Sequence, residues 1–203
     1  MTSLEHDLAR YYDQDASARA ARPIDPERIR RRDGFAHLLK TEERNLLLEV
    51  GIGPGTDAAA LQAMGLSVTG VDLSAQHATL SRGLGVDALV ASVLNLPFMD
   101  NTFDAVWSMS TLMHIANDSI ETALAEIKRV VVPGAPVALG MWGGDDGEGE
   151  YTEDTIEPRR FFSWRSTDRV RALLAAHGRI EVLDTWHAGA KSPHLYQWCI
   201  LRF

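Results

Sequence analysis

Short apolar runs alternate with helix-type patterns through most of this chain. The clearest run, 46–50, is continuous, as in a strand that is buried on both faces. Further runs that we interpret as strands lie at 66–71, 86–93, 103–109, 136–142, 179–186 and 194–203. Helical patterns lie between most of them, at about 57–64, 75–82, 118–131 and 168–177. Strands that alternate with helices predict an α/β fold.

Two segments differ from this alternation. Residues 3–21 and 27–40 are rich in helix formers, and we expect residues 1–40 to form an N-terminal helical cap. Residues 143–166 are too long for a simple connection, and they are rich first in glycine and acids and then in aromatic residues. The acidic part cannot bury itself, so we expect it to be mobile without a ligand.

A glycine turn, 51–55, connects the first of these strands to the helix that follows it. Glycine tolerates positive φ angles and lets a ligand approach the backbone. The spacing is G-x-G-x-G, whereas a dinucleotide fingerprint requires G-x-G-x-x-G. Glu49 and Asp57 flank the turn, and their carboxylates would repel a pyrophosphate but suit a ligand with an ammonium and a sulfonium group. Asp72 ends the next strand and can accept hydrogen bonds from ribose hydroxyls of either ligand.

Four segments carry a resemblance to a known family. LEVGIGPG followed by VTGVDLS resembles motif I and the acidic end of strand two in class I S-adenosylmethionine-dependent methyltransferases. LNLPFMDNTFDAVWSMSTLMHI and EIKRVVVPGAPVALGMW resemble the small-molecule branch of that family. The resemblance covers residues 45–142 and extends more loosely to the rest. The Ser-Met-Ser-Thr segment, 108–111, differs from the Asn/Asp-Pro-Pro-aromatic segment of enzymes that methylate adenine or amides.

The resemblance implies both the fold and the cofactor. We expect one Rossmann-like domain over residues 1–203, with helices on both faces of a seven-stranded sheet in the order 3-2-1-4-5-7-6 and strand seven antiparallel. The cofactor is expected to be S-adenosylmethionine. Its amino-acid part is assigned to Glu49, Gly51, Gly53 and Gly55, its ribose to Asp72, and its adenine to Leu73, Ser92, Val93 and Met109. Ser92 stands where the family commonly has Asp, and a hydroxyl binds an amino group more weakly.

Several polar and aromatic side chains near the expected cofactor have two interpretations. His114 follows the fourth strand, at the edge where open α/β sheets bind ligands, and it is either a general base or a packed residue. His77 is expected on the surface, with an adenine contact as the alternative. Tyr11 and Tyr12 are expected to pack the first helix onto the domain, with contact to a ligand as the alternative. Asp104 begins the fourth strand, at the end remote from the cofactor, and is expected to be structural.

The function expected from this resemblance is methyl transfer to an oxygen or nitrogen of a small molecule. Two alternatives remain: a methyltransferase-like protein that binds the cofactor without catalysis, and a nicotinamide-dependent oxidoreductase. Residues 143–166 are expected to form a substrate lid. The acids in its first part, 145–150, either attract a cationic acceptor or are simply solvated.

Composition and charge limit the classes of partner that we expect for this protein. The formal charge of −8 argues against a nucleic-acid surface. Arg28, Arg30, Arg31 and Arg32 are flanked by acids and are expected to form a solvated helix face. Cys199 is the single cysteine, no Cys/His spacing indicates a metal site, and no apolar run has transmembrane length. We therefore expect a cytoplasmic protein without membrane, metal or nucleic-acid partners, in an oligomeric state that the sequence leaves open.

Overall fold

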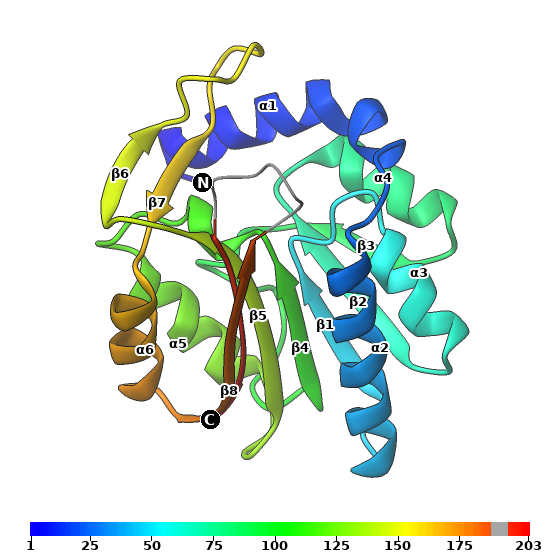
Figure 1. Ribbon diagram of the computed structural model, residues 1–203. Coiled ribbons are helices and arrows are strands. Elements are labelled where there is room, and N and C mark those ends of the chain that lie inside the picture. Colours follow the sequence, from blue (N-terminus) through cyan, green and yellow to red (C-terminus); the bar gives the residue numbers. More distant parts are fainter. Residues whose placement is uncertain (188–194) are drawn as a thin grey trace.

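The computed structural model describes residues 1–187 and 195–203, and it contains a seven-stranded sheet in the order β3-β2-β1-β4-β5-β9-β8 (Figure 1). This is the expected order, because β6 and β7 form a separate two-stranded hairpin and do not join the sheet. The sheet strands are β1 Leu46–Val50, β2 Ser67–Asp72, β3 Asp87–Val90, β4 Ala105–Met109, β5 Pro136–Gly143, β8 Arg179–His187 and β9 Leu195–Arg202.

The register of the central strands explains why their carboxyl ends share one edge. Leu48 of β1 pairs with Thr69 of β2 on one side and with Val106 of β4 on the other, both in parallel. Strand β9 runs antiparallel to both β5 and β8, as expected. The expected start of this last strand, His194, lies outside the described residues.

Helices cover both faces of the sheet, as expected. The helices are α1 Ser3–Ala20, α2 Pro26–Thr41, α3 Thr56–Ala63, α4 Ala75–Gly83, α5 Ile120–Val130 and α6 Thr167–Ala175, with a short 3-10 helix, η1, at Leu112–His114. Residues of α5 and α6 pack with Leu48 in one core, whereas residues of α2, α3 and α4 pack with Leu47 in another. Neighbouring residues of one strand thus face different cores, because side chains alternate across a sheet.

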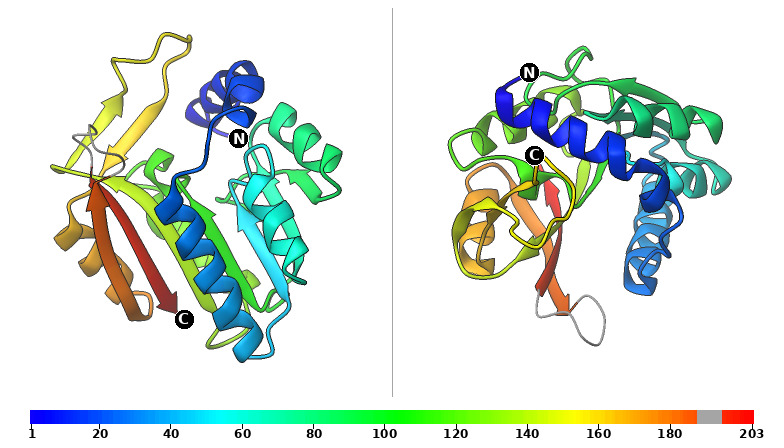
Figure 2. Two further views of the ribbon diagram at one scale, coloured as in Figure 1. Left: turned by 45° about the vertical axis from the view of Figure 1, so that its right-hand side comes forward. Right: turned by 90° about the horizontal axis from the view of Figure 1, so that it is seen from above.

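Helix α1 and the hairpin lie at the carboxyl edge of the parallel strands. Figures 1 and 2 show α1 across the top of the sheet, with the hairpin beside it. Asp13 of α1 accepts hydrogen bonds from Ser74 Oγ at 2.6 Å and from the Gln76 backbone at 3.0 Å. Tyr11 donates to Asp154 Oδ1 at 3.1 Å, so the same helix also contacts the loop of the hairpin.

The connection at 143–166 is more regular than its composition suggests. Its acidic part is strand β6, Gly147–Glu150, which pairs antiparallel with β7, Phe161–Trp164. The acidic part is mostly exposed, as expected. Its pairing with β7 was not predicted, because we expected a mobile segment without regular structure. Glycines weaken a strand pattern, so the partner strand eleven residues further along was not recognisable from the acidic segment alone.

Two other expectations were wrong. Strand β3 ends at Val90, so Ser92 and Val93 lie in the turn that follows it. The arginines of α2 are not a solvated face, because only Arg30 is well exposed, at 66% of its side chain. Arg32 is buried, and Arg31 packs its guanidinium 4.7 Å from the Trp198 ring centre.

Candidate active site

Two adjoining cavities open at the carboxyl edge of the sheet. The first has a volume of about 80 Å³ and lies at the ends of β1 and β2, under α1. The second has a volume of about 460 Å³ and lies between the glycine turn, α2 and the hairpin. The residues that line both are Arg19, Gly51, Gly53, Met109 and Ser110. The glycine turn therefore stands where the two cavities meet.

The glycine turn is open to a ligand on one side only. Gly51, with φ +75°, has no room for a side chain, since a Cβ there would lie 1.9 Å from Thr111 Oγ1. Gly53, with φ +56°, faces open space, because a Cβ there would meet nothing within 4 Å. Gly55 lines neither cavity, and its Cβ would lie 2.7 Å from Ser81 Oγ. Gly53 is thus the point of closest approach for a ligand, and Gly55 allows the turn to pack on α4.

Asp72 joins the end of β2 to the glycine turn. Its Oδ2 accepts a hydrogen bond from the Gly53 backbone at 2.8 Å, and its Oδ1 accepts one from the Ser74 backbone at 2.9 Å. The carboxylate also lines the first cavity, together with Leu73, Val93 and Met109. A carboxylate oxygen can accept more than one hydrogen bond, so Asp72 retains acceptor capacity toward a ligand.

Glu49 is a buried carboxyl group with an unsatisfied oxygen. It is 1% exposed, and its Oε2 has no hydrogen-bond partner among the described residues. Burial raises the pKa of Glu49 well above its ordinary value, and the neighbouring Asp57 raises it further. Burial thus favours the neutral form of the carboxyl, while Arg28 and Arg32 oppose this shift. An ammonium group would both satisfy the oxygen and restore the charge.

Asp57, the second acid beside the turn, is already engaged. It accepts hydrogen bonds from Arg28 Nε at 2.7 Å, Arg32 Nη1 at 3.3 Å and Trp107 Nε1 at 3.1 Å. These contacts tie α2 and β4 to the start of α3. Asp57 lines the second cavity but serves as an anchor for two arginines, which the sequence interpretation did not anticipate.

Ser92 does not line either cavity, because a residue of α1 lies next to it. Its Oγ donates to Glu5 Oε1 and accepts a hydrogen bond from the Leu94 backbone at 3.0 Å. Glu5 is buried and lines the first cavity. In the sequence, the spacing of Thr2 and Glu5 indicates only a capping box for α1, which the structure also contains. No local signal connects Glu5 with Ser92.

His114 is buried and held by hydrogen bonds at both ring nitrogens. Nδ1 lies 2.7 Å from the Phe161 carbonyl oxygen, which can only accept, so Nδ1 carries the hydrogen. Nε2 therefore accepts from the Tyr12 hydroxyl, at 2.7 Å. Burial lowers the pKa of His114 to about 3. His114 and Tyr12 line the first cavity together, so Tyr12 has a place at the site as well as a packing role.

His77 is not on the surface. It is 2% exposed, lines the first cavity, and places Nδ1 3.4 Å from Asp72 Oδ1. Helix α1 covers this part of α4, which is why the expectation of an exposed histidine was wrong. Asp104 is structural, as expected, because its Oδ2 accepts from the backbones of Asn45 and Leu46.

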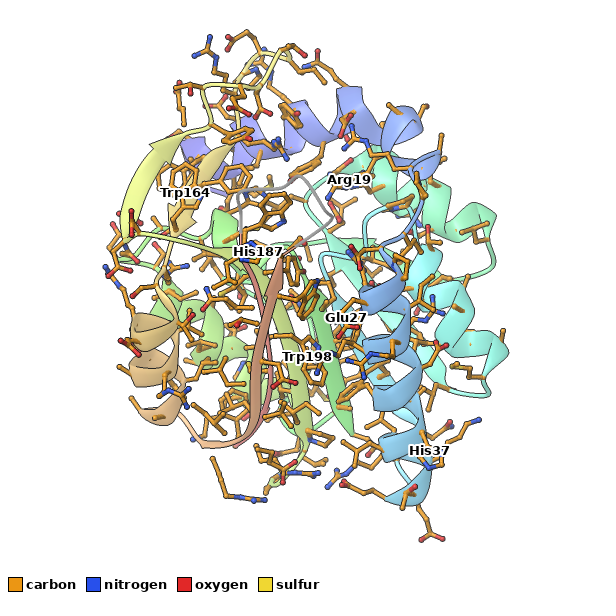
Figure 3. The ribbon with its side chains drawn as sticks, viewed as in Figure 1. Arg19, Glu27, His37, Trp164, His187 and Trp198 are labelled. Carbon is orange, nitrogen blue, oxygen red and sulfur yellow. The ribbon has the colours of Figure 1, made fainter. Side chains whose placement is uncertain are left out.

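Aromatic and arginine side chains dominate the second cavity. Its aromatic lining comprises Trp142, Tyr151, Phe162, Trp164, Trp186 and Tyr196. Arg19 of α1 and Trp164 of β7 both line the cavity, and Figure 3 shows where these two side chains lie. None of the acids at 145–150 lines it. Asp146 and Glu148 instead accept hydrogen bonds from the backbones of Ser166 and Asn117, respectively.

The described part of the chain shows neither a metal-binding cluster nor a membrane-spanning helix. No group of three or more His, Cys, Asp and Glu side chains is arranged to hold a metal ion within residues 1–187 and 195–203. Within the same ranges, no helix is long and apolar enough to cross a membrane.

Several known proteins that are similar to this chain are methyltransferases. A model of the methyltransferase-domain family matches residues 48–139. O-methyltransferase resE of Aspergillus sclerotiorum is 28% identical over 137 residues, or 63% of this chain and 50% of that protein. Probable tRNA methyltransferase 9B of Homo sapiens is 30% identical over 113 residues, or 55% of this chain and 24% of that protein. The chain thus spans half the length of the first relative and about a quarter of the second.

A solved structure agrees in fold over nearly the whole chain. The 1,6-didemethyltoxoflavin-N1-methyltransferase of Burkholderia thailandensis, with 1,6-didemethyltoxoflavin and S-adenosylhomocysteine bound, superposes with a TM-score of 0.71. The match has 20% identity and covers 98% of this chain and 88% of that one. The family match, the strand order and the acid-flanked glycine turn agree with one another. Residues 48–139 therefore form a methyltransferase domain, in a fold shared with a methyltransferase that was solved with S-adenosylhomocysteine bound.

Proposed function

We propose that this protein transfers the methyl group of S-adenosylmethionine to an oxygen or nitrogen atom of a small molecule. The observation that carries the proposal is the meeting of two cavities at the glycine turn. One cavity has the acidic strand end that suits a ribose, and the other is a larger, mostly aromatic chamber. Such a pair of adjoining sites is what a transfer between two bound molecules requires.

The residues present fit the cofactor in charge and in the hydrogen-bonding groups that they offer. Asp72 would hold the ribose, while Leu73, Val93 and Met109 would surround the adenine. Glu49 would pair with the ammonium group, since its buried Oε2 lacks a partner among the described residues. Gly53 leaves room for the amino-acid part to approach its backbone.

Arg19 would bind the carboxylate of the cofactor. It lines both cavities together with Gly51 and Gly53, so it stands beside the part of the turn assigned to the amino-acid end. Its only ion pair among the described residues is a long one, 3.8 Å to Asp15. Its guanidinium therefore has donors to spare for a ligand. Sequence patterns did not identify Arg19, because it reaches the turn only through the docking of α1.

The acceptor site would be the second cavity. Its volume of about 460 Å³ lies in the range of small-molecule pockets, about 300–1,000 Å³. Helix α1 and the hairpin stand on two sides of it, so residues 143–166 would act as a lid that excludes water. The cofactor supplies an activated methyl group when bound. The protein's own task is then to hold the nucleophile in line and to remove its proton.

We propose His114 as the general base, acting through the hydroxyl of Tyr12. That hydroxyl already donates to Nε2, so a proton taken up by the Tyr12 oxygen can be passed on to His114 once negative charge on the acceptor offsets the burial that lowers the pKa of the imidazole. Replacement of His114 by Gln keeps a hydrogen-bond acceptor for Tyr12 but removes the base. Turnover should fall by about 10²-fold or more, with cofactor affinity little changed. Unchanged turnover would assign His114 to packing alone.

The proposed function is tested by isothermal titration with S-adenosylmethionine and S-adenosylhomocysteine. We expect both to bind the folded protein at micromolar to millimolar concentration. Absence of binding at millimolar concentration would reject the proposal. Binding without methyl transfer across a panel of phenols, alcohols and amines would instead identify a protein that binds the cofactor without catalysis.

A further inference from the structure

The walls of the second cavity carry more positive than negative side chains. Its lining includes Arg19, Arg22, Arg28 and Arg160, and the acids in the same lining are Asp25 and Asp57. Asp25 accepts a hydrogen bond from the Glu27 backbone at 2.7 Å and caps α2. The acids of the hairpin at 145–150, which could have attracted a cation, do not reach this cavity.

Two carboxylates near the cavity are each shared between two arginines. Asp57 accepts from both Arg28 and Arg32. Asp15 is paired with Arg22 at 2.5 Å and with Arg19 at 3.8 Å. Arg32 has a second carboxylate partner, Asp33, at 2.8 Å, so the charge of Asp57 chiefly balances Arg28. At Asp15, one negative charge faces two guanidinium groups, so this cluster keeps a net positive charge that a negatively charged ligand would balance.

Arg28 is the arginine best placed to hold such a ligand within the cavity. Only its Nε has a hydrogen-bond partner among the described residues, which leaves its two terminal nitrogens as donors. Its side chain is 28% exposed, and it lines the second cavity but not the first. Burial alone would lower the pKa of Arg28, but the Asp57 carboxylate outweighs this and raises it, so the side chain stays charged.

The remaining walls are flat aromatic rings. Phe162 and Trp164 of β7 are stacked with an interplanar angle of 16° and a centroid distance of 5.3 Å. Trp186 and Tyr196, on β8 and β9, have their ring centres 4.9 Å apart. Ring faces of this kind bind planar molecules by stacking and by burial of apolar surface. The cavity thus combines aromatic walls with an arginine that has free donors.

We propose that the methyl acceptor is a small aromatic molecule that carries an anionic group, a carboxylate or a phosphoryl group, bound by Arg28. This inference rests on the proposed function and specifies its substrate class. The cofactor favours the same choice, because its sulfonium, ammonium and carboxylate groups together carry one positive charge beside the acceptor. Of the two interpretations of the acids at 145–150, this proposal favours solvated acids over the attraction of a cationic acceptor.

The first experiment uses the wild-type protein saturated with S-adenosylhomocysteine and four probes that share one phenol ring. These are 4-hydroxyphenylacetate, 4-hydroxybenzylphosphonate, the neutral 4-hydroxyphenylacetamide and the cationic tyramine. We expect at least one anion to bind about tenfold or more tightly than the amide, with tyramine weakest. Equal or tighter binding of the amide or tyramine, or no binding of either anion, would overturn the proposal.

The second experiment compares Arg28→Gln with Arg30→Gln. Arg30 lies on the same helix, is 66% exposed and lines neither cavity. Arg28→Gln should weaken binding of the tighter anion by about tenfold or more and change binding of the amide by less than about threefold. Arg30→Gln should change neither. Equal losses for anion and amide in Arg28→Gln would contradict the role given to Arg28.

Titration of each variant with S-adenosylhomocysteine separates the two proposals. If the cofactor product does not bind the wild-type protein, the proposed function fails. If it binds normally and the anions show no preference, the substrate class fails while the function stands. Normal binding in Arg28→Gln also shows that the variant is folded.

Discussion

Burial determines the protonation of two site residues more than their residue types do. Glu49 and His114 are 1% and 6% exposed, respectively. Desolvation disfavours the charged form of either group, which raises the pKa of the carboxyl and lowers that of the imidazole. In both side chains burial therefore favours the neutral form. A ligand or a neighbouring charge that stabilises the charged form would shift each pKa back toward its ordinary value.

Replacement of Glu49 by Gln should separate cofactor binding from stability. A glutamine has the shape of the protonated carboxyl, so the free energy of unfolding at pH 7 should change by no more than about 1 kcal/mol. Affinity for S-adenosylmethionine should fall by about tenfold, because the charged partner of the ammonium group is lost. Urea denaturation and isothermal titration measure the two effects.

Glu126→Gln is the matched control for this substitution. Glu126 accepts from the Leu96 backbone and from Arg129 and lines neither cavity. It should lose about 1 kcal/mol of stability and leave cofactor affinity unchanged. A loss of affinity in Glu126→Gln that equals that of Glu49→Gln would contradict a direct role for Glu49.

His114 should also make stability depend on pH. Its folded pKa of about 3 lies below the ordinary value of 6.5, so the unfolded chain binds more protons between these values. Stability is then fully present above pH 6.5 and falls as the pH decreases. Between pH 7 and pH 5 the wild type should lose about 2 kcal/mol more than His114→Gln, measured by urea denaturation.

His37→Gln provides the comparison for this pH effect. His37 is exposed and lies at the far end of α2 from the site (Figure 3). This variant should follow the wild-type pH dependence closely. An identical pH dependence in His114→Gln and in the wild type would show that His114 is accessible to protons in the folded state.

At the scale of elements, the hairpin and α1 decide which side chains meet at the sheet edge. The hairpin contributes Phe162 and Trp164 to the second cavity, and its Phe161 carbonyl fixes the tautomer of His114. Helix α1 contributes Tyr12, Glu5 and Arg19 to the first cavity. Both elements lie outside the part of the chain that the family model matches, 48–139.

Deletion of residues 145–150 should abolish turnover and leave cofactor affinity within a few-fold. The deletion removes β6, the pairing partner of β7, and so releases the strand that carries Phe162 and Trp164. Radiolabelled methyl transfer and isothermal titration measure the two quantities. Full activity after the deletion would place acceptor recognition elsewhere.

A control that removes two negative charges but no residues separates the effect of losing the strand from the effect of losing its acids. Asp145→Asn combined with Glu150→Gln changes two exposed acids that line neither cavity. This double variant should keep the Michaelis constant of the acceptor. A raised Michaelis constant would restore the idea that these acids attract the acceptor.

At the scale of the molecule, α1 closes the site over the first cavity. That cavity, at about 80 Å³, is much smaller than typical small-molecule pockets of about 300 Å³ or more. Binding of an adenosine there requires α1 to move away from α4. The buried apolar side chains of α1, Leu8, Tyr11 and Ala16, belong to neither of the two cores, and its hydrogen bonds include those of Asp13 with Ser74 and of Tyr12 with His114.

We expect hydrogen exchange to detect this opening. In the empty protein, backbone amides of α1 should exchange faster than those of α2, which packs Phe35 and Leu39 into the core. Addition of S-adenosylhomocysteine should protect α1 by about tenfold or more and leave α2 unchanged. Equal exchange in the two helices, with no change on binding, would show that the cofactor enters without movement of α1.

The sequence by itself determined the sheet and the centre of the site. Apolar runs, glycines and capping residues act on their near neighbours, so strand 46–50, the turn at 51–55 and the acid Asp72 were recognisable without a structure. The positions assigned to Leu73, Val93 and Met109 also line the first cavity. Local sequence was sufficient for these residues because the parallel strands of this fold place their carboxyl ends, and the turns that follow them, at one edge of the sheet.

Only the tertiary structure decided what covers that centre and how its charges are paired. The contacts of Ser92 with Glu5 and of His114 with Tyr12 join residues separated by 87 and 102 positions. The pairing of Arg28 and Arg32 with Asp57 likewise depends on how α2 packs against α3. No periodicity encodes such contacts, because they arise from the packing of whole elements. The burial and protonation of these side chains, and the pairing of charges around the second cavity, all follow from that packing.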